Sequence, residues 1–356
     1  MKILVPYMSA TESTLEEDVA ANVVPGGIEK FTQTLYKTIP GVVPVTITKS
    51  DRKSRATKKR IIAALDTESP DLIIMNDPWK AVHCINYGVP MILIIHEPLD
   101  RDIRMVALGK ILLDINNAGH HIYFVSPTQL EYHRQMAMRI SQTDFGEISG
   151  FVNPAYCDID IGPDRHVEWD CATVGRICTL KNPFLLHAVA GKSDLRTLVV
   201  TSTVDVKSRA VNNYALKHST WERPRETKFD MPHPDVLAHV ARSGSFMSTC
   251  PFESWGISAL EAFALGAHPI LITHEKLNGH SSAAIAASPD HYSTIPRKAK
   301  PEEAVELIRS RSKLSYDQRV EMSEMTKEMH SLNKWKGSID TMIQRRLETD
   351  ESNKSG

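Results

Sequence analysis

The sequence predicts an α/β protein of two domains, each built around a doubly wound parallel sheet. Three observations support this fold class. The chain has 356 residues, more than one hydrophobic core usually organises. Short apolar runs alternate with stretches of helical spacing, as expected for strands joined by crossover helices. A segment rich in turn residues, 153–170, separates two such series. We therefore expect two Rossmann-like domains facing a cleft.

The first series predicts an N-terminal domain over residues 1–158. Four short apolar runs predict its buried parallel strands: MKILVPYM (1–8), DLIIMN (71–76), PMILIIHE (90–97) and HIYFVSP (121–127). Three stretches between them have helical spacing: GGIEKFTQTLYKTI (26–39), TKKRIIAALDT (57–67) and RMVALGKILLDINNAG (104–119). We interpret residues 9–25 as a long loop before the first of these helices.

The second series predicts a C-terminal domain over residues 166–331. Its strands are expected at CATVGRI (171–177), TLVVTSTV (197–204), GSFMSTC (244–250) and HPILITH (268–274). Helical patterns fill the chain beyond residue 300. The last of them, 332–350, is expected to return to the first domain, and the polar end 349–356 is expected to be disordered.

Composition excludes some classes of protein. No apolar run reaches the ~18 residues of a membrane span, which predicts no integral membrane contact. The five cysteines form no C-x-x-C pair and are typical of reduced thiols in a cytosolic protein, so we expect a cytoplasmic location. The net charge of −1 argues neither for nor against nucleic acid.

Two glutamates stand in the otherwise apolar stretch CPFESWGISALEAFALG (250–266). Glu253 is expected in a loop after a strand, and Glu261 in a helix that begins at Gly256 and ends at Gly266. Such a loop lies at the carboxyl edge of the sheet, where α/β proteins bind ligands. The helix N-terminus offers N–H groups to a phosphate, and each carboxylate accepts hydrogen bonds from sugar hydroxyls.

A structural explanation of the same glutamate stays open. Ser258-x-x-Glu261 fits a capping box, in which Ser258 is the N-cap of a helix that starts at Ala259. That helix is short, and this interpretation does not explain why a glutamate stands at position 253.

Two further groups suit a phosphorylated ligand. Arg176 and Lys181 follow the first strand of the second domain and are able to neutralise a diphosphate without a metal ion. Gly26 and Gly27 precede a helix and let backbone N–H groups approach a ligand closely. Solvated surface charges and a simple turn are the respective alternatives.

Four stretches, in this order, resemble segments of retaining GT-B glycosyltransferases, especially glycosyltransferase family 4. They are PGGIEKF (25–31), IIHEP (94–98), VGRICTLKNP (174–183) and PFESWGISALEAFALGAHPILI (251–272). The resemblance covers nearly the whole chain, and Trp335 falls where the family's last helix returns to the N-terminal domain.

The resemblance implies transfer of a sugar from a nucleotide sugar, most simply a UDP-sugar, to an acceptor hydroxyl. The C-terminal domain then holds the donor and the N-terminal domain the acceptor. His96 is then expected to contact the transferred sugar or to help position the acceptor, Glu253 to bind the transferred sugar, and Glu261 to bind the ribose. The expected donor-binding residues are Gly26, Gly27, Arg176, Lys181, Gly256, Ile257, Ser258 and Glu261. We expect no metal ion and no cofactor besides the nucleotide sugar.

The acceptor is predicted from a basic run, KSDRKSRATKKR (49–60), with seven basic residues and one acid. Lys53, Arg55, Lys58 and Lys59 are its candidate phosphate-binding side chains. Compact size and the His-Glu-Pro segment resemble phage DNA α-glucosyltransferases, which implies a hydroxymethylated pyrimidine of duplex DNA as acceptor. Three alternatives stay open: a bacterial polysaccharide or lipopolysaccharide glycosyltransferase, a GT-B sugar epimerase, and a non-catalytic nucleotide-sugar-binding module.

Overall fold

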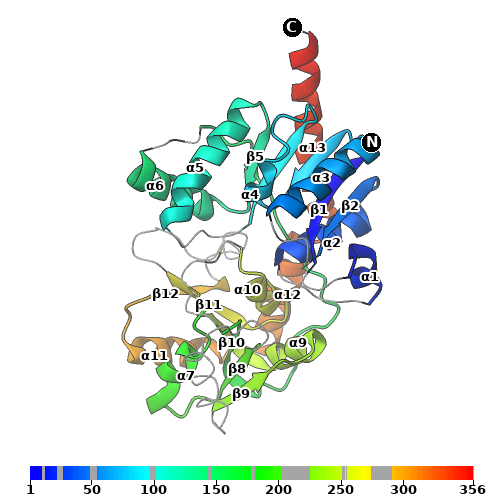
Figure 1. The fold of residues 1–356 in the computed structure, drawn as a ribbon. Helices are drawn as coiled ribbons and strands as arrows, with labels where there is room; N and C mark the ends of the chain where they lie inside the picture. Colours follow the sequence, from blue (N-terminus) through cyan, green and yellow to red (C-terminus); the bar gives the residue numbers. More distant parts are fainter. Residues whose placement is uncertain are drawn as a thin grey trace. The chain divides into compact units, whose positions relative to one another are not determined.

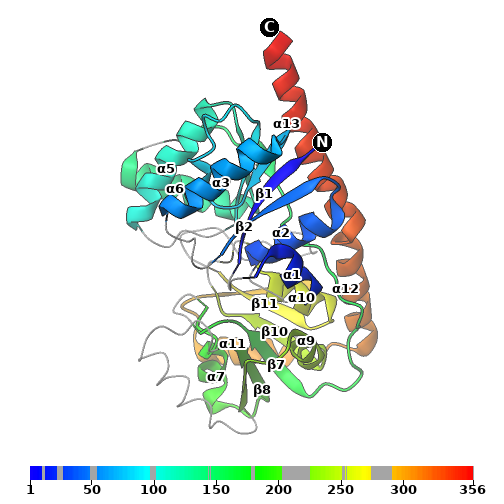
Figure 2. The ribbon, with the colours of Figure 1, turned by 45° about the vertical axis from the view of Figure 1, so that its right-hand side comes forward.

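The computed structural model describes residues 1–9, 13–21, 27–48, 54–96, 102–142, 144, 146–177, 181–202, 225–250, 253, 255–273 and 291–355. The chain divides into two compact units (Figures 1 and 2). Unit 1 comprises residues 1–156 and 332–356, and unit 2 comprises residues 157–331. No helix in the described ranges is long and apolar enough to cross a membrane.

Unit 1 is built on one six-stranded parallel sheet with the strand order β2-β1-β3-β4-β5-β6. Its strands are β1 (Ile3–Met8), β2 (Val42–Ile47), β3 (Leu72–Met75), β4 (Met91–Ile95), β5 (His121–Phe124) and β6 (Gly150–Phe151). The central strands β3 and β4 consist wholly of buried apolar residues, as a sheet covered on both faces requires. The strand order reverses between β1 and β3, which makes the carboxyl ends of these two strands a topological switch point.

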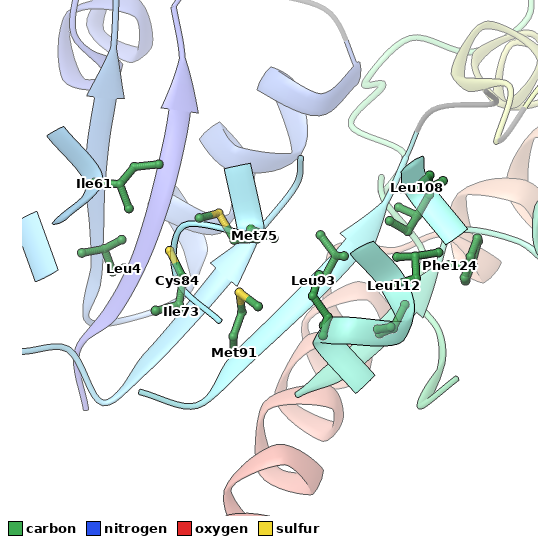
Figure 3. Close-up of a cluster of buried hydrophobic side chains, with 14 of the residues drawn as sticks. Leu4, Ile61, Ile73, Met75, Cys84, Met91, Leu93, Leu108, Leu112 and Phe124 are labelled. Atoms are coloured by element: carbon green, nitrogen blue, oxygen red, sulfur yellow. The ribbon is translucent and has the colours of Figure 1, made fainter. Parts of the chain in front are cut away.

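Helices cover both faces of this sheet. They are α1 (Leu15–Ala20), α2 (Gly27–Thr38), α3 (Ser54–Glu68), α4 (Pro78–Ala81), α5 (Asp102–Asn117), α6 (Pro127–Ser141) and α13 (Leu332–Ser355). On one face, Ile61 of α3 and Leu108 and Leu112 of α5 pack onto Leu4 and Leu93 of the strands (Figure 3). These side chains are almost fully buried, and their burial provides the main stabilisation of the unit.

The opposite face carries α2 and the last helix, which lie side by side in Figure 2. Trp335 of α13 is buried, with its ring centroid 6.0 Å from that of Phe31 and 5.9 Å from that of Tyr156. The expected disorder of the end of the chain is wrong for residues 349–355, because α13 continues to Ser355. The sequence of α13 contains no proline, and Gly337 is its one glycine.

The interpretation of residues 9–25 as a loop is also wrong in part, because α1 lies within it. Thr14 caps this helix, and the Thr14-x-x-Glu17 capping box is complete in both directions. Asp18 of α1 is buried and accepts hydrogen bonds from the Tyr7 hydroxyl (2.6 Å) and the Ser13 hydroxyl (2.5 Å). The sequence contained the signal for this helix in Thr14 and Glu17.

Unit 2 repeats the architecture with the strand order β12-β11-β10-β7-β8-β9, again all parallel. The strands are β7 (Trp169–Val174), β8 (Thr197–Thr201), β9 (Arg225–Phe229), β10 (Ser243–Ser248), β11 (His268–Thr273) and β12 (Ser293–Pro296). Here the order reverses between β7 and β10. The loops that follow these two strands therefore meet at the switch point of unit 2.

The helices of unit 2 are α7 (Leu185–Val189), α9 (His233–Ala241), α10 (Ile257–Ala264), α11 (Pro301–Arg311) and α12 (Tyr316–Met329), with a short 3₁₀ turn at Ala190–Lys192. The predicted α/β fold class with one doubly wound parallel sheet in each half is confirmed. The chain from 152 to 168 has no helix or strand, and β7 then opens the second sheet.

Buried histidines predict acid sensitivity in both units. Burial lowers the pKa of His133 in unit 1 to about 4 and that of His268 in unit 2 to about 3, from an ordinary value of 6.5. Below pH 6.5 the unfolded chain binds more protons than the folded chain. The stabilisation from the neutral rings is therefore complete above pH 6.5. It is lost as the pH falls from 6.5 toward the pKa values of the two rings in the folded chain.

We expect the free energy of unfolding to fall between pH 7 and pH 5 by about 2 kcal/mol for each of these histidines, from ~1.4 kcal/mol per pH unit below 6.5. Urea unfolding at pH 7, 6 and 5 measures this. A His133→Gln variant keeps a polar amide beside the Gln129 carbonyl. In this variant the fall in the free energy of unfolding between pH 7 and pH 5 should be about 2 kcal/mol smaller than in the wild-type chain. Equal stability of the wild-type chain at pH 7 and pH 5 would contradict the expectation.

Candidate functional site

The loops after β7 and β10 are joined at the carboxyl edge of the unit 2 sheet. Gly175 continues β7, with its N–H bonded to the Val200 carbonyl (3.1 Å) and its carbonyl accepting the Thr201 hydroxyl (2.7 Å). The Thr249 hydroxyl, directly after β10, donates to the Lys181 carbonyl at 2.5 Å. The backbone that carries Lys181 is thus fixed to the loop that carries Glu253.

Lys181 and Glu253 form an ion pair between these loops. Their side chains are 28% and 12% exposed, so the pair is partly shielded from water and its attraction is stronger than that of an exposed pair. The sequence identified both residues but did not predict that they touch. An ammonium group carries three N–H donors, so Lys181 is able to hold Glu253 and a phosphate oxygen together.

The helix after this loop begins as the sequence predicts. Gly256 is the N-cap of α10 in the left-handed conformation (φ 72°), and no side chain caps the helix. The capping-box interpretation is therefore wrong, because Ser258 lies inside the first turn. At the other end, Gly266 (φ 73°) donates to Phe263 O and Ala267 donates to Ala262 O, which is a Schellman motif.

Glu261 projects from the middle of α10 and contacts α9. Its Oε1 lies 3.1 Å from Nε2 of His233, the first residue of α9. Their side chains are 17% and 32% exposed. This contact explains how a carboxylate is accommodated beside the buried Leu260 and Ala262, and the sequence analysis did not find His233.

The remaining predicted donor residues of unit 2 lie at the same edge of the sheet. Arg176 follows Gly175 and its side chain is exposed, and Ile257 and Ser258 form the first turn of α10. A diphosphate is able to bind here through two cations and the helix N-terminus. Gly26 lies outside the described residues, and Gly27 is the first residue of α2 rather than part of a preceding turn.

Unit 1 contains a cavity of about 290 Å³ at its own switch point. It is lined by Pro6 and Met8 of β1, Ile28, Glu29 and Thr32 of α2, Met75 of β3, Ile95 of β4, and the residues Asn76, Asp77, Pro78, Trp79, Lys80 and His96 that follow β3 and β4. Its wall is mostly apolar, with a few polar groups at the strand ends. This composition is typical of a pocket for a small molecule.

His96 is held in this cavity by a directed chain of hydrogen bonds. The Thr32 hydroxyl donates to the Ile28 carbonyl (3.2 Å), and Asn76 Nδ2 donates to the Thr32 hydroxyl (3.1 Å). This leaves Asn76 Oδ1 as the acceptor for His96 Nε2, 3.0 Å away. Burial lowers the pKa of His96 to about 3, so the ring is neutral at pH 7 and its Nδ1 is a hydrogen-bond acceptor. The Phe31 ring packs against the imidazole of His96 in a tilted arrangement, with the two ring centroids 5.0 Å apart.

The predicted basic surface lies on α3. Arg55, Lys58 and Lys59 are exposed at spacings of three and four residues, while Thr57, Ile61 and Leu65 face the core. Lys53 lies outside the described residues. Burial lowers the pKa of His83, and the positive charges of Lys58 and Lys80 lower it further. The basic face of α3 thus lies near the α4 segment, whose Lys80 lines the cavity of unit 1.

Metal-ligating side chains do not gather in the described part of the chain: it contains no group of three or more His, Cys, Asp or Glu residues placed to hold an ion.

Comparison with known proteins identifies the fold. No protein-family model matches the sequence, and no curated protein matches it. Solved structures do match. Sucrose-phosphate synthase from Thermosynechococcus elongatus superposes with a TM-score of 0.73 at 10% identity, covering 98% of this chain and 99% of the other. HepE from Anabaena, in complex with UDP, gives a TM-score of 0.64 at 14% identity over 99% and 100% of the two chains. The lipopolysaccharide outer core galactosyltransferase WaaB gives 0.59 at 12% identity over 97% and 100%.

The chain therefore has the GT-B fold of these glycosyltransferases, with one parallel sheet in each of two α/β units. The expectation of a GT-B fold, drawn from four short segments, is confirmed.

Proposed function

We propose that the protein is a glycosyltransferase that moves a hexosyl or pentosyl group from a UDP-sugar to an acceptor hydroxyl, with retention of the anomeric configuration. One observation carries this proposal: the switch point of unit 2 brings Lys181 and Glu253 into contact, with Arg176 and Glu261 at the same sheet edge. The GT-B fold agrees with it, and HepE, of the same fold, binds UDP-glucose and UDP.

In the proposed reaction, unit 2 binds the donor. Glu261 accepts hydrogen bonds from the ribose hydroxyls, and Glu253 from the transferred sugar. The bond between the anomeric carbon and the β-phosphate oxygen breaks, and a bond from that carbon to the acceptor oxygen forms. The acceptor proton passes to the departing phosphate. Arg176 and Lys181 stabilise the negative charge that develops on this leaving group, so the reaction needs no metal ion and no cofactor.

The cavity of unit 1 is the proposed site of the acceptor. Its volume of about 290 Å³ is at the lower end of small-molecule sites, ~300–1,000 Å³, and therefore suits a single ring. Trp79 supplies an aromatic face, and the neutral His96 offers Nδ1 to a hydroxyl group. An imidazole that stays uncharged at pH 7 is able to accept this hydrogen bond throughout the physiological range.

We propose a hydroxymethylated pyrimidine of duplex DNA as the acceptor ring, extruded from the helix into the cavity. The exposed cations of α3 support this, because they lie near Lys80 at the cavity and match a phosphate backbone. The protein then acts in the cytoplasm, that of the host if a phage encodes it. A polysaccharide or lipopolysaccharide acceptor is the second candidate, favoured by the fold shared with WaaB.

If α3 contacts three phosphates, log K for duplex DNA should fall with log salt at a slope of about 2.7, from ~0.9 per contact. Affinity then drops about 40-fold between 50 and 200 mM salt. The triple variant Arg55→Gln, Lys58→Gln, Lys59→Gln should flatten this slope and raise KM for DNA, with unchanged UDP binding. Fluorescence anisotropy at several salt concentrations measures the slope.

The matched control changes Lys37, Lys110 and Arg139 to glutamine, three exposed cations on other helices of unit 1. It removes the same charge and should keep the wild-type slope. Transfer from a panel of UDP-sugars to hydroxymethylated DNA, followed as UDP release, tests the acceptor itself. Absence of transfer to DNA, together with transfer to a polysaccharide, would assign the function to the second candidate.

A further inference from the structure

His233 is placed firmly at the start of α9. Pro232 is the N-cap (φ −55°, ψ 142°) and Pro234 follows in the first turn, so both neighbours have a restricted backbone. The preceding segment is tied to the end of β8: the Asp230 N–H donates to the Thr201 carbonyl (2.9 Å), and the Ser202 hydroxyl donates to Asp230 Oδ1 (2.9 Å). The imidazole thus projects from a fixed position at the sheet edge.

The contact between His233 and Glu261 joins two helices that are separate in sequence. Nε2 and Oε1 are 3.1 Å apart, and the two residues are 28 positions apart in the chain. Because a carboxylate only accepts hydrogen bonds, Nε2 must donate, whether the ring is neutral or charged. Glu261 has three side-chain torsions, and this contact restrains them.

We propose that His233 is a positioning residue, which holds Glu261 in the orientation that binds the donor ribose. The inference rests on the proposed function, since it needs a nucleotide at unit 2. His233 engages Oε1, and the carboxylate held in this way accepts the hydrogen bonds of the ribose hydroxyls in the proposed complex. A side chain restrained before binding loses less freedom when the nucleotide arrives, so the free protein is already organised for the donor.

The ribose is remote from the bond that breaks, so this contact is equal in the ground state and in the transition state. Loss of His233 should therefore raise KM for the UDP-sugar and leave kcat nearly unchanged. The expected weakening of UDP binding is about fivefold to tenfold. A glutamine at 233 keeps an N–H donor and should restore affinity to within about twofold of the wild-type value.

The test is a double-mutant cycle, with UDP binding measured by calorimetry on His233→Ala, Glu261→Ala and the double variant, and with His233→Gln alongside. We expect His233→Ala to weaken binding in the wild-type background and to have no further effect when Glu261 is alanine. His239→Gln is the control, because this residue is on the same helix and contacts Arg242 instead. It should bind UDP as the wild-type chain does.

Two outcomes would overturn the proposal while leaving the function intact: wild-type affinity in His233→Ala, or losses that add independently in the double variant. A general disturbance of α9 would weaken His233→Gln as much as His233→Ala and would likewise overturn it. If the folded wild-type chain binds no UDP, the proposed function fails, and this inference fails with it.

Discussion

Replacing Arg176 and Lys181 together by alanine is expected to lower kcat for sugar transfer by about a hundredfold to a thousandfold, while the protein stays folded. Removing one preorganised donor from a developing charge costs ~10²–10³ in rate, and this variant removes two cations. Arg176 is exposed and Lys181 half-buried, and their backbone positions depend on Gly175 and Thr249 rather than on their side chains. The fold should therefore tolerate the change.

Steady-state UDP release by the wild-type protein and the double variant measures the effect. Arg309→Ala with Lys313→Ala is the matched control, because it also removes two cations from the surface of unit 2. Arg309 lies in α11, and Lys313 lies two residues after the end of this helix. The control should turn over normally. Wild-type activity should also survive EDTA. Loss of activity in EDTA that manganese restores, or a double variant with normal kcat, would contradict the role of these two residues.

Arg319→Met is expected to destabilise unit 2 by several kcal/mol, because each buried acceptor left without a donor costs ~1–3 kcal/mol. Arg319 on α12 is 1% exposed. Its guanidinium donates to four backbone carbonyls, those of Gly266 (2.9 Å), Asp164 (2.8 Å), Ala241 (2.6 Å) and Ser243 (3.1 Å). Methionine fills similar space but donates nothing, so these carbonyls lose a partner in a place that excludes water.

Scanning calorimetry measures this change, because it resolves transitions of units that unfold separately. One thermal transition of the variant should shift downward by several degrees or more. Arg309→Met, at an exposed arginine paired with Asp194, should move the same transition little, since exposed pairs contribute ~0–1 kcal/mol. An unchanged thermogram for Arg319→Met would show that other groups satisfy the four carbonyls.

The sequence predicted the central strands well and the edges of the sheets poorly. β3 and β4 are wholly apolar, because both faces of a central parallel strand are covered. The analysis missed β2, β6, β9 and β12, which lie at sheet edges. Pro44 within β2 and the polar sequence RETKF of β9 suit edge strands, where one side of the ladder needs no partner.

The site was predictable one residue at a time but not in its contacts. Glu253, Glu261 and Lys181 were identifiable because charged side chains interrupt apolar stretches or follow strands. The contacts join elements distant in the chain: Lys181 lies 72 residues from Glu253, and in unit 1 Asn76 lies 20 residues from His96. Only the strand order brings such pairs together, because β10 lies beside β7 in unit 2 and β4 lies beside β3 in unit 1.

Calorimetric titration of UDP into the wild-type chain in the presence of EDTA tests the central claim, that unit 2 binds a nucleotide sugar without a metal ion. We predict saturable binding at one site per chain. Glu261→Ala should weaken it at least tenfold, because a hydrogen bond to a charged group contributes ~1.5–3 kcal/mol. A folded wild-type protein that takes up no UDP, or equal affinity in the wild type and Glu261→Ala, would contradict the account.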